Sequence, residues 1–157
     1  MANNDIEKAE KYAQRLLRVR QRSENELNTR LGRKGFDNRT IANLIDQFKE
    51  KGLLDDVKFA RSWVNSRMKL NPKGALALRH ELIEKGISKE NIDLVIPKNV
   101  EFEEETVKRL VSEKAKQLKG LPKTKAKKRL YDYLARRGFK YEVIDTVIGK
   151  TIDIDEK

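Results

Sequence analysis

Basic side chains near the C-terminal third of the chain are the residues best suited to bind an anion. Seven of them lie close together: Lys123, Lys125, Lys127, Lys128, Arg129, Arg136 and Arg137. Ammonium and guanidinium groups form charge-assisted hydrogen bonds with phosphate and carboxylate oxygens. We therefore expect these residues to contact either phosphates or an acidic protein surface.

The net charge of the chain is concentrated in the same segment. The chain has 157 residues and a formal net charge of +11, from 36 basic and 25 acidic residues. Residues 108–140 contain 13 of the basic residues and only two acidic ones, Glu113 and Asp132, so this segment alone accounts for the excess. Such a concentration predicts binding to a polyanion or an acidic partner. A solvated, lysine-rich helix face is the alternative.

Two further groups of residues could add to such a contact. A second, smaller basic set lies near the N-terminus: Arg15, Arg18, Arg20 and Arg22. Three aromatic rings lie among the C-terminal basic residues: Tyr131, Tyr133 and Tyr141. Of these, Tyr133 or Tyr141 could stack on a nucleic-acid base. Packing against other side chains is the more common role for each tyrosine, and also for the single tryptophan, Trp63.

Catalytic chemistry has little support among the residues present. The only histidine is His80, and the adjacent carboxylates Asp55 and Asp56 are better explained by the start of a helix. Cysteine is absent, which excludes a disulfide scaffold, a zinc–thiolate site and a cysteine nucleophile. No glycine-rich phosphate loop and no metal-ligand cluster is visible. We predict a protein that is not an enzyme and needs no cofactor or metal.

A helical pattern that occurs three times must position these residues. The three copies read "KGFDNRTIANLI" at 34–45, "KGISKENIDLVI" at 85–96 and "RGFKYEVIDTVI" at 137–148. In each copy, leucines stand eight and four residues before the glycine, a bulky apolar residue follows it, and isoleucines stand six and ten residues after it. Leucines four residues apart lie on one helix face, and a glycine in the left-handed conformation commonly ends a helix. Each copy therefore predicts a helix, a glycine turn and a second helix.

A further amphipathic helix precedes each copy, because apolar residues recur there at helical spacing. The first of these helices has a stripe that begins at Ile6 and continues through Ala9 and Ala13. We therefore predict an all-α protein of three tandem three-helix repeats, similar to helix-turn-helix units, at residues 5–50, 55–97 and 102–150. Three such units in a row predict an elongated molecule.

Polar residues are expected to cap the starts of several helices. The segment "SENE" predicts a capping box, with Ser23 as the N-cap and Glu26 three residues later. Asp55 and Ser88 are expected to be the N-caps of two later helices, and Asn38 that of the second helix of the first copy.

Four motifs, in this order, resemble the RecX family of bacterial regulatory proteins: "SENELNTRLGRKGF", "GLLDDVKFARSWVNSR", "LRHELIEKGI" and "LYDYLARRGFKYEVI". The resemblance runs from about residue 9 to residue 149. It implies three three-helix repeats in a curved, elongated array. It also implies a protein that modulates the RecA recombinase, usually as an inhibitor, by lying in the groove of the RecA–DNA filament. There it would limit filament growth or favour disassembly. The family has no catalytic residues to transfer.

Direct binding to DNA is the main alternative, and a scaffold for another protein is a third. Helix-turn-helix units can read DNA, but the last helix of each copy has few Arg, Asn or Gln side chains for base edges. Contact with phosphates, without sequence specificity, fits the basic segment better. The N-terminus lacks a secretory pattern, and no apolar run approaches the ~18 residues that span a membrane. We expect a cytoplasmic monomer that binds the RecA filament, with single- or double-stranded DNA as a further candidate partner and no membrane.

Overall fold

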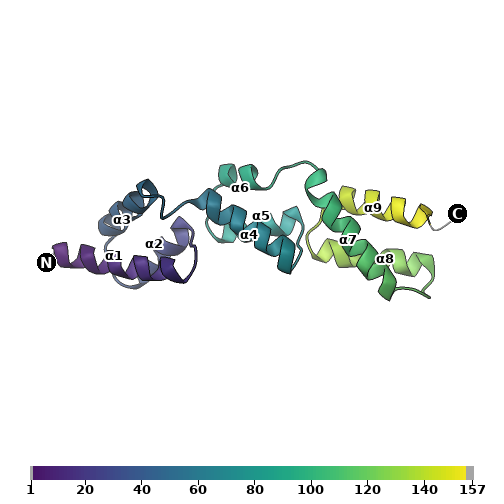
Figure 1. Cartoon of the computed structure of the whole chain (residues 1–157), viewed down its shortest axis with the longest axis horizontal. Helices are drawn as coiled ribbons and strands as arrows, with labels where there is room; N and C mark the ends of the chain where they lie inside the picture. Colours follow the sequence, from purple (N-terminus) through teal and green to yellow (C-terminus); the bar gives the residue numbers. More distant parts are fainter. Residues whose placement is uncertain (1, 155–157) are drawn as a thin grey trace. The chain divides into compact units, whose positions relative to one another are not determined.

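The structure, a computed structural model, describes residues 2–154 and is entirely helical within that range, apart from turns and loops. Nine helices occur in this part of the chain: α1 Ala2–Val19, α2 Glu24–Arg33, α3 Asn38–Glu50, α4 Asp56–Leu70, α5 Ala75–Glu84, α6 Lys89–Val95, α7 Glu101–Gln117, α8 Lys123–Arg136 and α9 Tyr141–Ile154. They follow one another in three groups of three (Figure 1). The prediction of an all-α protein built from three-helix repeats is confirmed.

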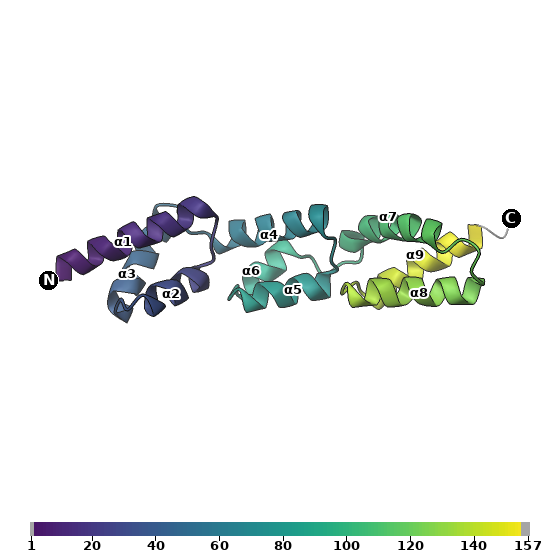
Figure 2. The same cartoon turned by 90° about the horizontal axis from the view of Figure 1, so that it is seen from below.

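The first group, α1 to α3, has a core to which all three helices contribute. Its buried side chains include Ala9, Ala13, Leu27, Leu31, Ile41, Leu44 and Phe48. The spacing of three or four residues within each helix turns these side chains to one face. Ile6, which the sequence placed in the same stripe, is instead 44% exposed. It lies at the N-terminal end of α1, which extends beyond α2 and α3 (Figures 1 and 2).

The last group, α7 to α9, has a core of the same design. These three helices lie side by side in both views (Figures 1 and 2). Its buried side chains come from all three helices: Val107, Leu110, Val111, Leu118, Leu130, Leu134, Phe139, Val143, Ile144, Val147 and Ile148. The leucines before the third glycine and the isoleucines after it are therefore core residues, as the repeat predicts.

The expected side-chain caps are present on three helices. The backbone N–H of Glu26 donates to Ser23 Oγ at 3.1 Å, and the Glu26 carboxylate accepts from the Ser23 N–H at 3.3 Å, which completes the capping box at the start of α2. Asp55 Oδ1 accepts from the backbone N–H of Lys58 in α4 at 3.0 Å. Ser88 Oγ likewise accepts from the backbone N–H of Asn91 in α6 at 3.2 Å. Each cap satisfies an N–H that the helix itself leaves unpaired.

The cap of α3 differs from the prediction. Its N-cap is Asp37, and Asn38 is the first helical residue. Asp37 Oδ1 accepts from the Thr40 N–H at 3.0 Å, and Oδ2 accepts from the Thr40 hydroxyl at 2.6 Å. A carboxylate has two acceptor oxygens and carries the negative charge that a helix start favours, which explains why Asp37 is preferred to its neighbour.

The described chain divides by its packing into two units. Each unit contains one joint, which is the contact between the start of the second helix of one repeat and the glycine turn of the next repeat. The first unit contains the residues up to Trp63 together with Leu82–Val95, and the second contains Val64–Glu81 together with the residues from Ile96 on. Because this division cuts across the second predicted repeat, the boundaries 5–50, 55–97 and 102–150 stay a prediction. The elongated, curved arrangement also stays a prediction.

In the first unit, the start of α2 packs against the second glycine turn. Ser23 Oγ donates to the carbonyl oxygen of Lys85 at 2.7 Å. Gly86 follows with a φ of 77°, in the left-handed region that glycine adopts without strain. A Cβ on Gly86 would lie 2.3 Å from the Cβ of Asn25, so the turn can approach α2 only without a side chain.

In the second unit, the start of α5 packs against the third glycine turn in the same way. The Gly74 N–H donates to the carbonyl oxygen of Arg137 at 2.8 Å, and the Leu76 N–H donates to that of Gly138 at 3.1 Å. A Cβ on Gly74 would lie 2.2 Å from the backbone of Gly138, and a Cβ on Gly138 would lie 2.5 Å from the Cβ of Ala77. The fully buried Glu103 carboxylate accepts hydrogen bonds beside this joint. One kind of joint therefore occurs twice.

Glu26 links the two sides of the first joint. Its carboxylate accepts from Arg20 through both Nη atoms at 3.0 Å, and from Lys85 Nζ at 3.0 Å. Burial by itself disfavours the charged form, but the hydrogen bonds from Arg20, Lys85 and the Ser23 backbone outweigh it and lower the pKa of Glu26 to about 2. The charged carboxylate is therefore more favourable in the folded than in the unfolded chain.

This depressed pKa predicts a loss of stability in acid. A group whose pKa is lower in the folded state contributes stability above its unfolded pKa, here 4.5, and loses that contribution as the pH falls toward about 2. We expect Glu26→Gln to reduce the free energy of unfolding near pH 7 and to make it less dependent on pH below 4.5. Urea unfolding followed by circular dichroism at several pH values measures this. Glu50→Gln, at an exposed residue of α3, is the control, and equal pH dependence in Glu26→Gln and the unaltered chain would contradict the assignment.

Candidate binding surface

The basic run of the C-terminal segment forms the first two turns of α8. All five of its members are exposed: Lys123, Lys125, Lys127, Lys128 and Arg129. The first turn of α8 has no acidic residue, and its N-cap, Pro122, provides no side-chain hydrogen bond. The N-terminus of a helix carries a partial positive charge, so acidic residues are favoured there and lysines are not. α7 follows this rule, since three glutamates lie in its first turn. At the start of α8, the positive charge of the basic side chains therefore adds to the partial positive charge of the helix N-terminus, and both attract anions.

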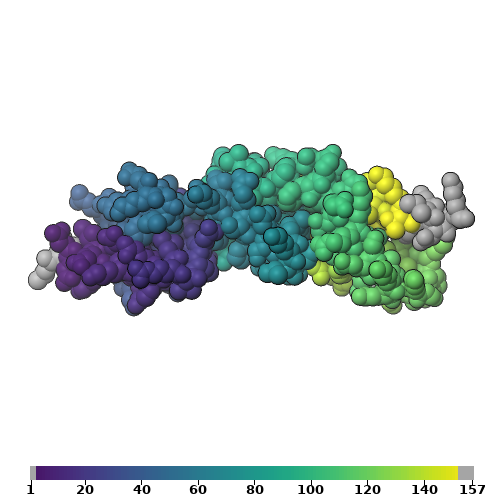
Figure 3. Space-filling view, viewed as in Figure 1, coloured from purple at the N-terminus to yellow at the C-terminus, as the bar shows by residue number. Residues whose placement is uncertain are grey.

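The first turn of α8 is also an addition to the repeat. α2 begins 11 residues before Gly35, and α5 begins 11 residues before Gly86, whereas α8 begins 15 residues before Gly138. The four extra helical residues, Lys123–Ala126, correspond to residues 20–23 and 71–74 of the other two repeats, which lie outside the helices. Only Ala126 among them packs against the core. Figure 3 shows atoms of α7 and of the start of α8, in green, beside each other on the face in view. This turn therefore adds exposed positive charge at a helix start, where basic residues are not favoured.

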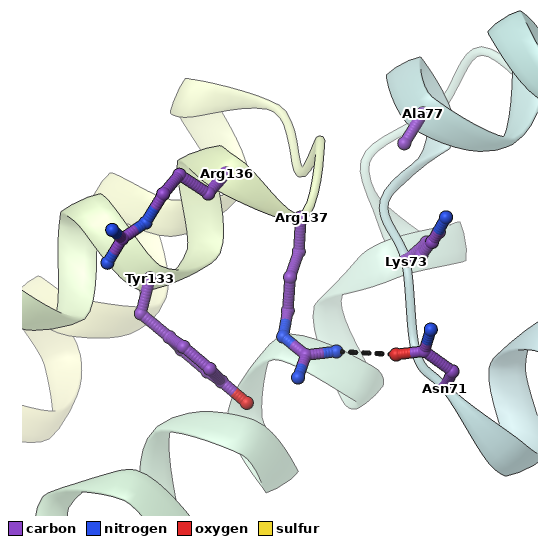
Figure 4. Close-up of a pocket in the computed structure, with 6 residues that line it drawn as sticks. All are labelled: Asn71, Lys73, Ala77, Tyr133, Arg136 and Arg137. Atoms are coloured by element: carbon purple, nitrogen blue, oxygen red, sulfur yellow. Dashed lines mark hydrogen bonds between the residues drawn. The ribbon is translucent and has the colours of Figure 1, made fainter.

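The two arginines at the end of α8 differ in their surroundings. Arg136 is exposed, and its Nε donates to the carbonyl oxygen of Asp132 at 3.2 Å. Arg137 is half-buried, and its Nη1 donates to Asn71 Oδ1 at 3.1 Å and to the Pro72 carbonyl oxygen at 2.9 Å. The two side chains extend in different directions, and Arg137 points toward the segment that precedes α5 (Figure 4).

Three of the four N-terminal arginines are exposed, and the fourth is buried. Arg15 and Arg18 are exposed on α1. Arg20 is held by its paired hydrogen bonds to Glu26. Arg22 is only 8% exposed, and its Nε donates to the Leu16 carbonyl oxygen at 3.3 Å. Burial, together with the nearby Arg20, lowers the pKa of Arg22. Arg22 therefore offers little exposed surface to a partner, and its place in the binding set stays a prediction.

The aromatic residues near the basic run are mostly occupied by packing. The Tyr131 hydroxyl donates to Asp145, and burial and this carboxylate raise the pKa of Tyr131 well above its ordinary value. The Tyr133 ring lies 5.2 Å from Lys114 Nζ and 4.8 Å from the Arg137 guanidinium. Tyr141 remains 69% exposed, and its ring lies 5.7 Å from that of Tyr131.

Trp63 of the first unit is likewise engaged with its neighbours. It is half-buried, and its ring stacks on that of Phe59 at 6.0 Å. The ammonium group of Lys85 lies 4.9 Å from the Trp63 ring centroid. These contacts agree with packing as the role of this side chain.

The residues that could be imagined as catalytic have structural roles or lie apart. Asp55 caps α4, and Asp56 Oδ1 accepts from the Glu24 N–H at 2.9 Å. Burial raises the pKa of Asp56. His80 is exposed on α5. Within residues 2–154 no three His, Asp or Glu side chains are grouped as metal ligands would be. In the same range, every helix is too short or too polar to cross a membrane.

Comparison with known proteins decides the family. Models of the first, second and third three-helix domains of RecX match residues 9–48, 55–96 and 102–148. The "Regulatory protein RecX" of Mycolicibacterium smegmatis is 35% identical over 148 residues, which cover 91% of this chain and 79% of that protein. The chain belongs to the RecX family. The resemblance inferred from the four sequence motifs is thereby confirmed.

Other RecX proteins agree in sequence and in fold. The "Regulatory protein RecX" of Chlorobium phaeobacteroides is 37% identical over 142 residues, which cover 88% of this chain and 90% of that protein. The crystal structure of RecX from Lactobacillus salivarius superposes with a TM-score of 0.86, covering 94% of this chain and 97% of that chain at 23% identity. At this identity the second comparison concerns the fold alone. These relatives are named as regulatory proteins and not as enzymes.

Proposed function

We propose that this RecX protein binds the RecA–DNA filament, in its groove, and inhibits RecA by limiting filament growth or by promoting disassembly. The observation that carries the proposal is the additional, exposed basic turn at the start of α8 in a chain of the RecX family. Family membership supplies the regulatory role, and the basic turn supplies a surface for a negatively charged partner. Acidic recombinase surface and DNA phosphates both have the required chemistry, and the protein would act as a cytoplasmic monomer.

DNA-stimulated ATP hydrolysis by RecA tests the proposal. RecX is titrated into RecA assembled on single-stranded DNA, and the rate of hydrolysis is measured. We expect inhibition at well below one RecX molecule per RecA subunit, because a molecule that acts on the filament groove or end affects many subunits. A basic protein of similar size and net charge is the control for non-specific competition for DNA.

A second candidate function is DNA binding without sequence specificity. The net charge of +11 in residues 108–140 favours it. Unchanged ATP hydrolysis, together with salt-sensitive binding of RecX to DNA alone, would contradict the first proposal and support this one.

A further inference from the structure

A pocket beside the second joint brings together part of the candidate surface. Its volume is about 360 Å³, and its lining comes from the segment before α5, from the start of α5 and from the end of α8: Asn71, Lys73, Ala77, Tyr133, Arg136 and Arg137 (Figure 4). All of these residues belong to the second unit. The three charged side chains in the lining are cationic, and the lining has no carboxylate.

Arg137 is fixed in this pocket with part of its guanidinium unused. Nη1 donates to Asn71 Oδ1 and to the Pro72 carbonyl oxygen, and the guanidinium lies against the Tyr133 ring (Figure 4). Nε and Nη2 donate to no residue in the described part of the chain, and Arg137 forms no ion pair there. The Nε–Nη2 edge of an arginine matches two oxygens of one phosphate or carboxylate. Lys73, in contrast, is already paired with Glu81.

At the first joint the cation before the glycine has a carboxylate partner, which is missing at the second joint. Lys85 precedes Gly86 as Arg137 precedes Gly138, and both cations lie against an aromatic ring. Lys85, however, is neutralised by Glu26, nine residues before Gly35. The residue nine before Gly86 is Ala77, which lines the pocket of the second joint. The cation before the glycine therefore has a carboxylate partner at the first joint and none at the second, where the buried Glu103 accepts from the backbone N–H groups of Ala75 and Lys140 instead.

We infer that this pocket binds one phosphate group of a nucleic-acid backbone, which occupies beside Arg137 the position that the Glu26 carboxylate occupies beside Lys85. A nucleic acid fits better than an acidic peptide because further cations lie along the same helix, and the repeated phosphates of one strand can contact several of them. The bound phosphate would touch both sides of the second joint and stabilise it. This inference rests on the proposed function, since the nucleic acid would be the DNA of the RecA filament.

Ala77→Glu tests the inference by supplying the missing carboxylate. Position 77 is the third residue of α5, as Glu26 is the third residue of α2, so a glutamate is compatible with the helix start. Binding to a fluorescein-labelled oligo-dT is measured by anisotropy at several salt concentrations. We expect affinity to fall roughly tenfold, as for the loss of one charge-assisted contact. The slope of log affinity against log salt should fall by about 0.7, the value for one phosphate of a single strand.

Ala42→Glu makes the same chemical change at an exposed position of α3 in the first unit and is the matched control. Its affinity should change less than twofold, and thermal unfolding establishes that both variants fold. If Ala77→Glu does not fold, Arg137→Lys replaces it, because it keeps the charge and removes the two-nitrogen edge. Equal affinities of the Ala77→Glu and Ala42→Glu proteins for oligo-dT, or an affinity loss without a change in salt slope, would overturn the inference.

Two assays separate this inference from the proposed function. If the Ala77→Glu protein binds oligo-dT as tightly as the unaltered protein, the phosphate site is overturned, even if the unaltered protein inhibits RecA. If Ala77→Glu weakens oligo-dT binding but the unaltered protein leaves ATP hydrolysis by RecA unchanged, the phosphate site is supported and the proposed function is contradicted. Competition by ATP as strong as that by unlabelled oligo-dT, at equal phosphate concentration, would show a site for free nucleotides and overturn the assignment to a nucleic-acid backbone.

Discussion

Alanine in place of Gly74 should destabilise the second unit by roughly 3 kcal/mol, at the upper end of the cost of overpacking a well-packed site. Its Cβ would lie 2.2 Å from the backbone C and O of Gly138 and the N of Phe139. Backbone atoms cannot rotate away as a flexible side chain can, so the joint must open. The hydrogen bond from the Gly74 N–H to the Arg137 carbonyl oxygen, 2.8 Å long, would be strained or lost with it.

Gly32→Ala is the matched control and should have the opposite sign. Gly32 lies inside α2, and a Cβ there would have no atom within 4 Å beyond its own helix. Alanine is favoured over glycine within a helix by about 0.8–1 kcal/mol, so the variant should be slightly more stable than the unaltered protein. Urea unfolding followed by circular dichroism measures both changes. Equal stability of Gly74→Ala and the unaltered protein would contradict the close approach at the joint.

A second pair separates backbone strain from close approach. Gly35 and Gly138 both have a positive φ, at 97° and 80°, so alanine is strained at either position. A Cβ on Gly35 would meet nothing within 4 Å, whereas one on Gly138 would lie 2.5 Å from Ala77. Gly138→Ala should therefore be the more destabilising of the two.

Reversal of charge at Lys127, Lys128 and Arg129 should abolish most of the inhibition of RecA. Changing these three residues to glutamate alters the net charge of α8 by −6 on an exposed surface, so helicity by circular dichroism should stay unchanged. If DNA phosphates are the partner, five to seven contacts on a single strand give a salt slope of roughly −3.5 to −5, and loss of three contacts removes about 2 of it. Affinity for single-stranded DNA at moderate salt should then fall by more than about tenfold.

The control for this variant carries the same charge change elsewhere. Lys51, Lys58 and Arg61 are exposed residues outside the segment 108–140, and their replacement by glutamate should leave most of the inhibition intact. Inhibition that persists in full after reversal on α8 would exclude the basic run as the contact surface. Equal losses in the two triple variants would show that net charge, and not the position of the run, is responsible.

The fold could be predicted from the sequence because its cause is local. Leucines and isoleucines four residues apart define a helix face wherever they occur, and glycine ends a helix through its own backbone freedom. Ser23, Asp55 and Ser88 were assigned correctly as caps for the same reason, since a cap acts within three residues. The prediction was wrong at Asn38, where two adjacent side chains can both cap and only their geometry decides between them.

The family and the charge asymmetry were likewise set by the sequence, because motif order and residue counts do not depend on folding. Only the tertiary structure decided which cations are buried or paired with a carboxylate. Arg22 is buried and Arg20 is paired with Glu26, although both stand in the same basic stretch as the exposed Arg18. Contacts between residues that are distant in the sequence, such as Lys85 with Glu26 (59 apart) and Arg137 with Asn71 (66 apart), depend on how the repeats join. The spacing within a repeat fixes each helix face, but the joint decides which charged groups meet, since it brings together segments that are distant along the chain.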